Sequence, residues 1–205
     1  MTWKIDDPQC DEAAKIRWEL VEYTSGQGLD LGCGQFKAFP HFIGVDNGHH
    51  WGMKGVDVSV ETCEDLSLFA SQSMDFVFSS HLLEHIKDHG KALKEWWRVL
   101  KQGGRLCLYL PHKEHYPNIG QEGANTDHKH DFMPEDIETA MKKIGGWDLL
   151  RNETRTEGRE YSFFQVYQKQ QGNKHRFSYQ NPKPEKSAAV IRYGAVGDAL
   201  IAASV

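Results

Sequence analysis

The sequence predicts an α/β protein with a mostly parallel sheet that helices cover on both faces. Short apolar segments alternate with amphipathic helical segments along the chain, an order typical of βαβ units. Residues 89–100, HGKALKEWWRVL, place Leu93, Trp96, Trp97 and Leu100 at helical spacing, with charged residues between them. The apolar runs MDFVFSS before this helix and RLCLYL after it have the length of buried strands.

The boundaries of the expected elements follow from their flanking residues. Ser25-Gly26 stops the first helical pattern, Gly103-Gly104 is expected to end the second helix, and Pro134 suits the first turn of the third. We expect helices at 11–23, 89–100 and 134–144. We expect seven strands, at 29–33, 41–46, 56–58, 74–80, 105–110, 147–150 and 161–168. Ligands bind such sheets beyond the carboxyl ends of the strands.

The composition is that of an ordinary globular protein. The chain has 205 residues, of which 39% are hydrophobic and 26% are charged. Its formal net charge of -5 argues against a broad nucleic-acid surface. The four cysteines form no CxxC pair and are expected to be free thiols in a reducing compartment. The N-terminal residues contain no apolar signal-peptide region, and no stretch approaches the roughly 20 apolar residues of a membrane span. We therefore expect a cytoplasmic protein with no nucleic-acid partner.

The segment GLDLGCGQFK, residues 28–37, places an acid, Asp30, inside an apolar strand and two glycines in the turn that follows. Gly32 and Gly34 would let a ligand approach the backbone closely, although a tight turn alone would also use them. Asp46 ends the second strand, where a carboxylate can accept both hydroxyls of a ribose; a solvated acid is the alternative. Asp65 could accept an adenine amine or serve as a helix N-cap.

These segments together resemble the class I S-adenosylmethionine-dependent methyltransferases of the type 11-like group. The resemblance covers residues 9–168 and is carried, in order, by LDLGCG, IGVDN, CEDLS, MDFVFSSHLLEHI and ALKEWWRVLKQGGRLCLYLP. It implies a Rossmann-like fold and S-adenosylmethionine as cofactor. The cofactor-binding residues that it implies are Asp30, Gly32, Cys33, Gly34, Asp46, Asn47, Glu64, Asp65, Leu66, Ser79 and Ser80.

Two features depart from the family pattern. Phe36 and Lys37 stand near the place of the usual third glycine, which also argues against a nicotinamide-dependent oxidoreductase. Only six residues, 35–40, separate Gly34 from the second expected strand, whereas a parallel crossover normally takes a dozen or more. The first crossover must therefore be a short turn, unless the strand limits differ.

The acceptor side is expected to use histidine, because imidazole accepts a proton near neutral pH. The resemblance places His81 beside the cofactor, and His112 follows the fifth strand, so these two are our candidate catalytic residues. His81 and His85 in HLLEH have i, i+4 spacing, which would resemble half of a zinc site but lacks the HExxH order. The loop 111–131 offers a second candidate set: His112, His115, His128 and Asp131. We favour a polar substrate loop and expect no metal.

The expected function is methyl transfer to a small-molecule or glycan acceptor at oxygen. In some relatives the order NPPY or DPPY marks methylation of amino groups, and this order is absent at SSHL, residues 79–82. The alternative is a cofactor-binding regulatory or scaffold domain without turnover. We divide the chain into a methyltransferase domain at 1–168, a polar linker at 169–187 and an apolar segment at 188–205. VIRYGAVGDALIAASV at the end resembles the opening βα unit of heptosyltransferase-like GT-B glycosyltransferases. That resemblance implies a fused glycosyltransferase domain and a glycan acceptor.

Overall fold

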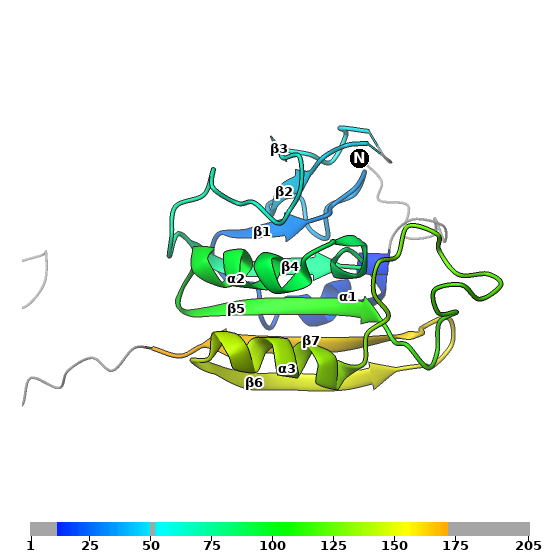
Figure 1. Ribbon diagram of the computed structural model, residues 1–205. Coiled ribbons are helices and arrows are strands. Elements are labelled where there is room, and N and C mark those ends of the chain that lie inside the picture. Colours follow the sequence, from blue (N-terminus) through cyan, green and yellow to red (C-terminus); the bar gives the residue numbers. More distant parts are fainter. Residues whose placement is uncertain (1–11, 50–51, 172–205) are drawn as a thin grey trace, which may run out of the picture. The chain divides into compact units, whose positions relative to one another are not determined.

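The computed structural model describes residues 12–49 and 52–171, which form one α/β unit (Figure 1). The apolar segment 188–205 and nearly all of the expected linker 169–187 lie outside the described residues. The elements are α1 (Glu12–Leu20), β1 (Gly28–Leu31), β2 (Ile43–Asp46), β3 (Val58–Ser59), β4 (Met74–Ser80), the 3-10 helix η1 (Leu83–His85), α2 (His89–Val99), β5 (Leu100–Pro111), α3 (Pro134–Ile144), β6 (Trp147–Arg155) and β7 (Ser162–Lys169).

The strands form one seven-stranded sheet in the order β3-β2-β1-β4-β5-β7-β6. β1 to β5 pair in parallel, and β7 pairs antiparallel with both β5 and β6. Helices α2 and α3 cover one face and α1 covers the other, as Figure 1 shows. The predicted fold class, a mostly parallel seven-stranded sheet with helices on both faces, is confirmed.

Alternation of side chains along β4 divides the core into two layers. Phe76 and Phe78 pack toward α1 with Ile16 and Leu20, while Val77 packs on the opposite face toward α2. This is the two-residue period of a strand that is buried on both sides. The expected strand 74–80 and its buried character are confirmed.

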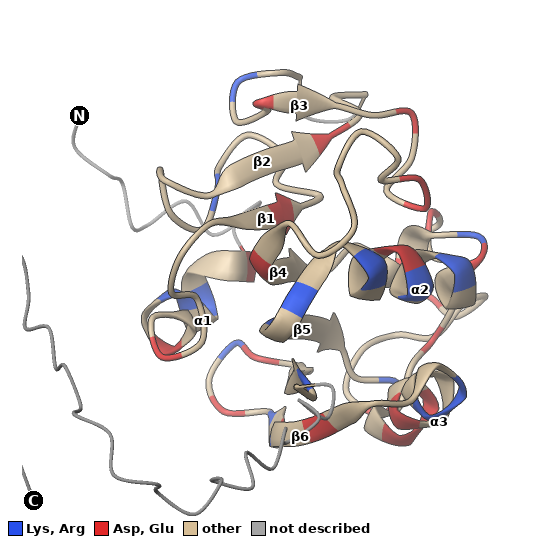
Figure 2. Ribbon diagram, turned by 90° about the vertical axis from the view of Figure 1, so that its left-hand side faces the viewer, with Lys and Arg blue, Asp and Glu red and all other residues tan. Residues whose placement is uncertain are grey.

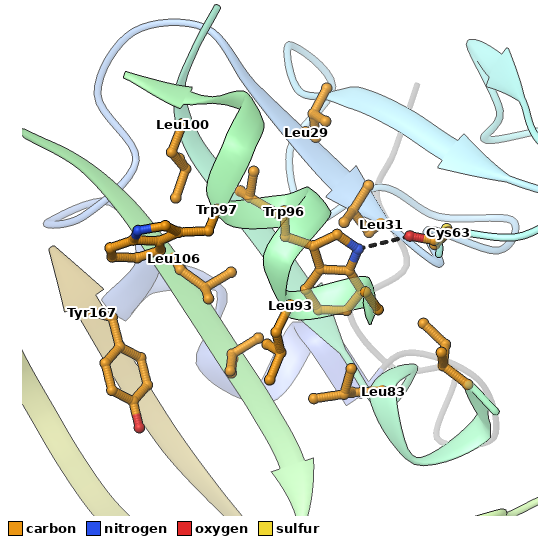
Figure 3. Packing of buried hydrophobic residues seen from close by; sticks show 14 of the residues in the cluster. Leu29, Leu31, Cys63, Leu83, Leu93, Trp96, Trp97, Leu100, Leu106 and Tyr167 are labelled. Atoms are coloured by element: carbon orange, nitrogen blue, oxygen red, sulfur yellow. Dashed lines mark hydrogen bonds between the residues drawn. The ribbon is translucent and has the colours of Figure 1, made fainter. Parts of the chain in front are cut away.

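Trp96 is the largest fully buried side chain of the layer beneath α2. Its indole lies among Leu31, Leu83 and Leu93, and its Nε1 donates a hydrogen bond to the carbonyl oxygen of Cys63 at 2.8 Å (Figure 3). The bond ties helix α2 to the segment that follows β3. A buried indole with a satisfied N–H adds both apolar area and a fixed orientation.

Several expected bounds were wrong: α1 ends at Leu20 and not at residue 23, and β6 extends to Arg155 and not only to residue 150. β5 begins at Leu100, not at Arg105, because Gly103 and Gly104 do not end the helix. They lie inside the strand, in an irregularity where the register jumps between Met74 and Phe76. Gly103 has φ +80°, so a glycine there permits the bulge. A helix stop and a strand bulge use the same residue type, which explains the error.

The first crossover has no helix. β1 ends at Leu31, so Cys33 belongs to the turn and not to the strand, and residues 32–42 reach β2 through turns alone. The strand ends at Leu31, and Gly32 turns the chain away from the strand direction with a left-handed φ of +69°. Among the described helices, none is both long and apolar enough to cross a lipid bilayer.

We predict that Trp96→Ala lowers the free energy of unfolding by about 3–5 kcal/mol, because it empties a large core volume and leaves the Cys63 carbonyl unpaired. Trp18→Ala is the matched control, since that indole is 75% exposed and its loss should change the free energy by no more than about 0.5 kcal/mol. Urea denaturation measures both. Equal effects of the two substitutions would show that Trp96 does not anchor α2.

Candidate functional site

A cleft of about 660 Å³ opens at the carboxyl ends of β1, β2 and β4. One half is lined by the turn after β1 and by the segments after β2 and β3. The other half is lined by residues that follow β4, by the loop that follows β5, and by Glu12 and Tyr161. Figure 2 shows acidic residues at the ends of β1 and β2, on the side where this cleft lies. The cleft therefore has the position that parallel sheets use for ligands.

The turn after β1 exposes backbone to the cleft. Gly32 and Gly34 have φ values of +69° and +54°, which L side chains rarely adopt. A Cβ on Gly32 would also lie 2.9–3.0 Å from the side chain of Leu82. The backbone amide of Gly32 donates to the carbonyl oxygen of Val45 at 2.8 Å, which extends the pairing of β1 with β2 by one step. Glycine at this position is thus required by both conformation and space.

The carboxylate of Asp46 connects β2 to this turn. Its Oδ2 accepts a hydrogen bond from the amide of Gly34 at 3.0 Å, and its Oδ1 accepts one from the amide of Gly48 at 2.8 Å. Each carboxylate oxygen has further acceptor capacity, and the residue lines the cleft. Asp46 is therefore held in a fixed orientation by backbone donors while it still lines the cleft.

Asp30 is 3% exposed and lies beneath the same turn. Its Oδ2 accepts a hydrogen bond of 2.6 Å from the amide of Ala38, in the crossover to β2. An acid inside this apolar strand thus organises the loop that borders the cleft. It also lines the cleft floor.

The structure brings most of the expected cofactor-side residues together. Those that line the cleft are Asp30, Gly32, Cys33, Gly34, Asp46, Asn47, Glu64 and Ser80. The Oγ atom of Ser80 is buried and has no hydrogen-bond partner among the described residues.

Three expected cofactor residues lie elsewhere. Asp65 is exposed, and its Oδ1 accepts a hydrogen bond from the amide of Ser67 at 2.8 Å, as in an Asx turn. Leu66 and Ser79 are fully buried and do not line the cleft. Glu64, next to Asp65, does line the cleft. The prediction that an acid of this segment binds the adenine amine therefore stays open between Glu64 and Asp65.

His81 stands where the chain leaves β4, with φ +48°. Its amide donates to the carbonyl oxygen of Tyr109 at 2.9 Å, and its Nε2 lies 2.9 Å from the Oγ of Ser162. Burial holds the pKa of His81 well below its usual range, and the positive charges of Lys15 and nearby histidines act in the same direction. A left-handed backbone at a residue other than glycine is uncommon and is often found at functional sites.

His112, the second expected catalytic residue, does not line the cleft. It is 4% exposed at the end of β5, and its ring contacts that of His115, with 4.7 Å between the ring centroids. The other residues of this candidate set lie in different places. His128 lines the cleft, whereas Asp131 lies outside it and accepts a hydrogen bond from the amide of Ile119. The expected alternative set of His112, His115, His128 and Asp131 is therefore not brought together.

The HLLEH segment does not form one helical turn. The 3-10 helix covers only Leu83–His85, and the left-handed backbone at His81 precedes it. Glu84 is fully buried, and burial raises its pKa to about 8. Its Oε1 lies 3.9 Å from a nitrogen of His81, of His85 and of His128.

Glu12 and Tyr161 are among the residues of the cleft that sequence reasoning missed. The phenol of Tyr161 donates to Oε1 of Glu12 at 3.0 Å, and the ring lies 5.0 Å from that of Tyr116. Glu12 is on α1 and Tyr161 directly precedes β7, so no local pattern connects them. Glu84, in contrast, has a local signal, because it stands between two histidines.

We predict that Gly32→Ala lowers the free energy of unfolding by about 1–2 kcal/mol, because the new side chain forces a left-handed conformation against Leu82. Gly90→Ala is the control. It lies in α2 with space for a Cβ and should raise stability by about 0.5–1 kcal/mol. Thermal or urea denaturation distinguishes them, and a neutral Gly32→Ala would contradict the steric argument.

Comparisons with known proteins agree with this geometry. Residues 29–108 match the family model described as a methyltransferase domain. No curated protein matches the chain.

Solved structures share the fold at low sequence identity. A protein from Pyrococcus horikoshii OT3 has a TM-score of 0.61 and 18% identity, over 82% of this chain and 94% of that one. A SAM-dependent methyltransferase from Archaeoglobus fulgidus has a TM-score of 0.58 and 16% identity, over 77% and 92% of the two chains. One from Methanosarcina mazei has a TM-score of 0.56 and 17% identity, over 75% and 98%. The match over residues 29–108 indicates that the chain is an enzyme whose cofactor is S-adenosylmethionine.

Proposed function

We propose that this enzyme transfers the methyl group of S-adenosylmethionine to a hydroxyl of a small-molecule or glycan acceptor. The observation that carries the proposal is the division of the cleft. A backbone-lined half beside Gly32, Gly34 and Asp46 adjoins a half that is rich in aromatic and polar side chains. The second half is where an acceptor would lie against the cofactor.

The first half fits the cofactor. S-adenosylmethionine supplies a methyl group on a positively charged sulfur, together with an ammonium group, a ribose and an adenine. Gly32 and Gly34 line the cleft, where their backbone would approach such a ligand closely, and Asp46 would accept the ribose hydroxyls. The unpartnered Oγ of Ser80 in the same cleft is a buried polar atom that a ligand would satisfy.

The second half favours a neutral acceptor with hydroxyl groups. The phenols of Tyr116 and Tyr161 offer flat apolar rings with polar edges, and the carboxylate of Glu12 can accept a hydroxyl hydrogen. Seven carboxylates and two lysines line the whole cleft, a balance that disfavours a polyanionic nucleic acid. The C-terminal resemblance to glycosyltransferases supports a glycan among the acceptors. The free thiols of Cys33, Cys63 and Cys107 favour a cytoplasmic location for the reaction.

Catalysis would depend mainly on alignment. A methyl group moves from sulfur to oxygen by in-line displacement, so the S–C bond breaks as the O–C bond forms and the hydroxyl proton leaves. His81 follows β4 and lines the second half of the cleft, where it would position the acceptor or take that proton.

The acceptor class can be tested with labelled S-adenosylmethionine and matched pairs of acceptors. Neutral sugars should be labelled, whereas the corresponding amino sugars should gain no additional label on nitrogen and oligonucleotides should stay unlabelled. Mass spectrometry locates the methyl group. Methylation of nitrogen alone, or of nucleic acid, would overturn the proposal.

We predict that Asp46→Asn weakens the binding of S-adenosylhomocysteine at least tenfold, because a charge-assisted contact to a ribose contributes roughly 1.5–3 kcal/mol. Asp65→Ala should have a smaller effect, since that carboxylate is exposed and turned toward Ser67. Calorimetry measures both affinities, with thermal denaturation of the free proteins as a check on folding. An unchanged affinity in Asp46→Asn would remove this residue from the cofactor site.

We predict that His81→Ala lowers turnover far more than it lowers cofactor affinity. His81 follows β4 and lines the half of the cleft assigned to the acceptor, so its ring would contact the acceptor more than the cofactor. Steady-state kinetics and calorimetry on the same preparation separate the two effects. Equal losses of turnover and affinity would indicate a purely structural role.

A further inference from the structure

In the described part of the chain, the carboxylate of Glu84 is buried without the hydrogen-bond donors that an ionised group needs. Its carboxylate is fully inaccessible, and neither oxygen has a hydrogen-bond partner among the described residues. Burial of an ionised carboxyl without donors or an opposite charge is strongly unfavourable. A proton, a bound water or a metal ion must therefore satisfy this group.

The atoms around Glu84 are metal-ligand atoms. The Nε2 atoms of His85 and His128 each lie 3.9 Å from Oε1 of Glu84, and the three ligand atoms all lie within 4.8 Å of one another. Ligand atoms around a tetrahedral zinc ion lie about 3.4 Å apart, so shifts of roughly 0.5 Å would bring all three into contact with one ion.

The supporting contacts fix the two distant segments together. The amides of Lys129 and His130 both donate to the main-chain carbonyl oxygen of Glu84, at 2.7 and 3.2 Å. These bonds attach the loop that carries His128 directly to the turn that carries Glu84 and His85. The ring of His128 is further held between those of His85 and Tyr116, with centroid distances of 4.7 and 5.3 Å. Such support around ligands is typical of metal sites.

We propose that Glu84, His85 and His128 bind a divalent transition-metal cation, with zinc as the representative ion, at the acceptor side of the cleft. Two imidazoles and one carboxylate suit zinc, iron and related ions more than magnesium or calcium. Three protein ligands leave a position open, as in catalytic sites. All three residues line the cleft, so the open position faces the acceptor half.

The role of the ion rests on the proposed function. A cation at this place would hold an acceptor hydroxyl oxygen and lower the pKa of that hydroxyl, beside the methyl group that it receives. Binding of the ion itself depends only on the three side chains, so the site and the methyl transfer can be tested separately.

A second cluster provides the matched control. His112, Glu114 and His115 also place their ligand atoms within 4.8 Å of one another, but Glu114 and His115 are exposed and the cluster lies outside the cleft. Exposed groups of this kind commonly hold no ion. His115→Ala therefore removes a histidine from the same loop without touching the proposed site.

The test uses the full chain, stripped with a chelator and titrated with zinc, manganese and cobalt(II) by calorimetry, with the cobalt absorption spectrum as a second readout. We expect one equivalent per chain, at least tenfold weaker binding in Glu84→Gln and in His128→Ala, and no change in His115→Ala. S-adenosylhomocysteine binding in each variant confirms that the fold is retained.

Two results would overturn the proposal: no stoichiometric binding of any of the three ions, or binding that His115→Ala removes and Glu84→Gln leaves intact. The first would mean that a proton or water satisfies Glu84. Normal metal binding without hydroxyl methylation would instead refute the proposed function and leave the metal site standing. Full methylation by the stripped enzyme, with metal binding intact, would refute only the role of the ion.

Discussion

The hydrogen bond from the amide of His81 to the carbonyl oxygen of Tyr109 determines how the chain leaves the central strand of the sheet. It continues the pairing of β4 with β5 through a residue whose φ is +48°, so the chain turns sharply while it is still attached to the sheet. The turn places Leu82 against Gly32 and directs Glu84 inward. The close approach of Leu82 to the glycine turn and the position of the buried carboxylate therefore both depend on this one strained junction.

Between β1 and β4, aspartate side chains hold the connecting loops in place of packed helices. No helix is described between β1 and β4, and the loops there are held by side-chain bonds to the backbone: Asp30 accepts from Ala38, Asp46 from Gly34, and Asp57 from Gly44 and Lys37. The Lys37 and Gly44 bonds hold the pKa of Asp57 below its usual range. Two of these three acids also line the cleft, so the groups that stabilise the loops are the groups that a ligand would meet.

Local patterns predicted the sheet and the half of the cleft beside β1 and β2, because those features depend on short segments with strict requirements. Apolar runs, a left-handed glycine and an acid at a strand end each leave a signal within a few residues. The bulge at Gly103 was missed because a glycine pair signals a helix stop equally well. Glu12, Tyr161 and the grouping of His128 with Glu84 depend on contacts between distant segments, and a single sequence carries no record of these.

The two halves of the cleft differ in how freely their side chains can be substituted. The match to a methyltransferase domain spans residues 29–108, which include the glycine turn, Asp46, His81 and Glu84, but not the loop that contains Tyr116 and His128. That loop contacts the rest of the site through side-chain rings and through the two backbone bonds to Glu84. Since those bonds use main-chain atoms only, side chains in the loop could change without loss of the connection. Under the proposed function, acceptor specificity can therefore diverge in this loop while the turn after β1 keeps its backbone geometry.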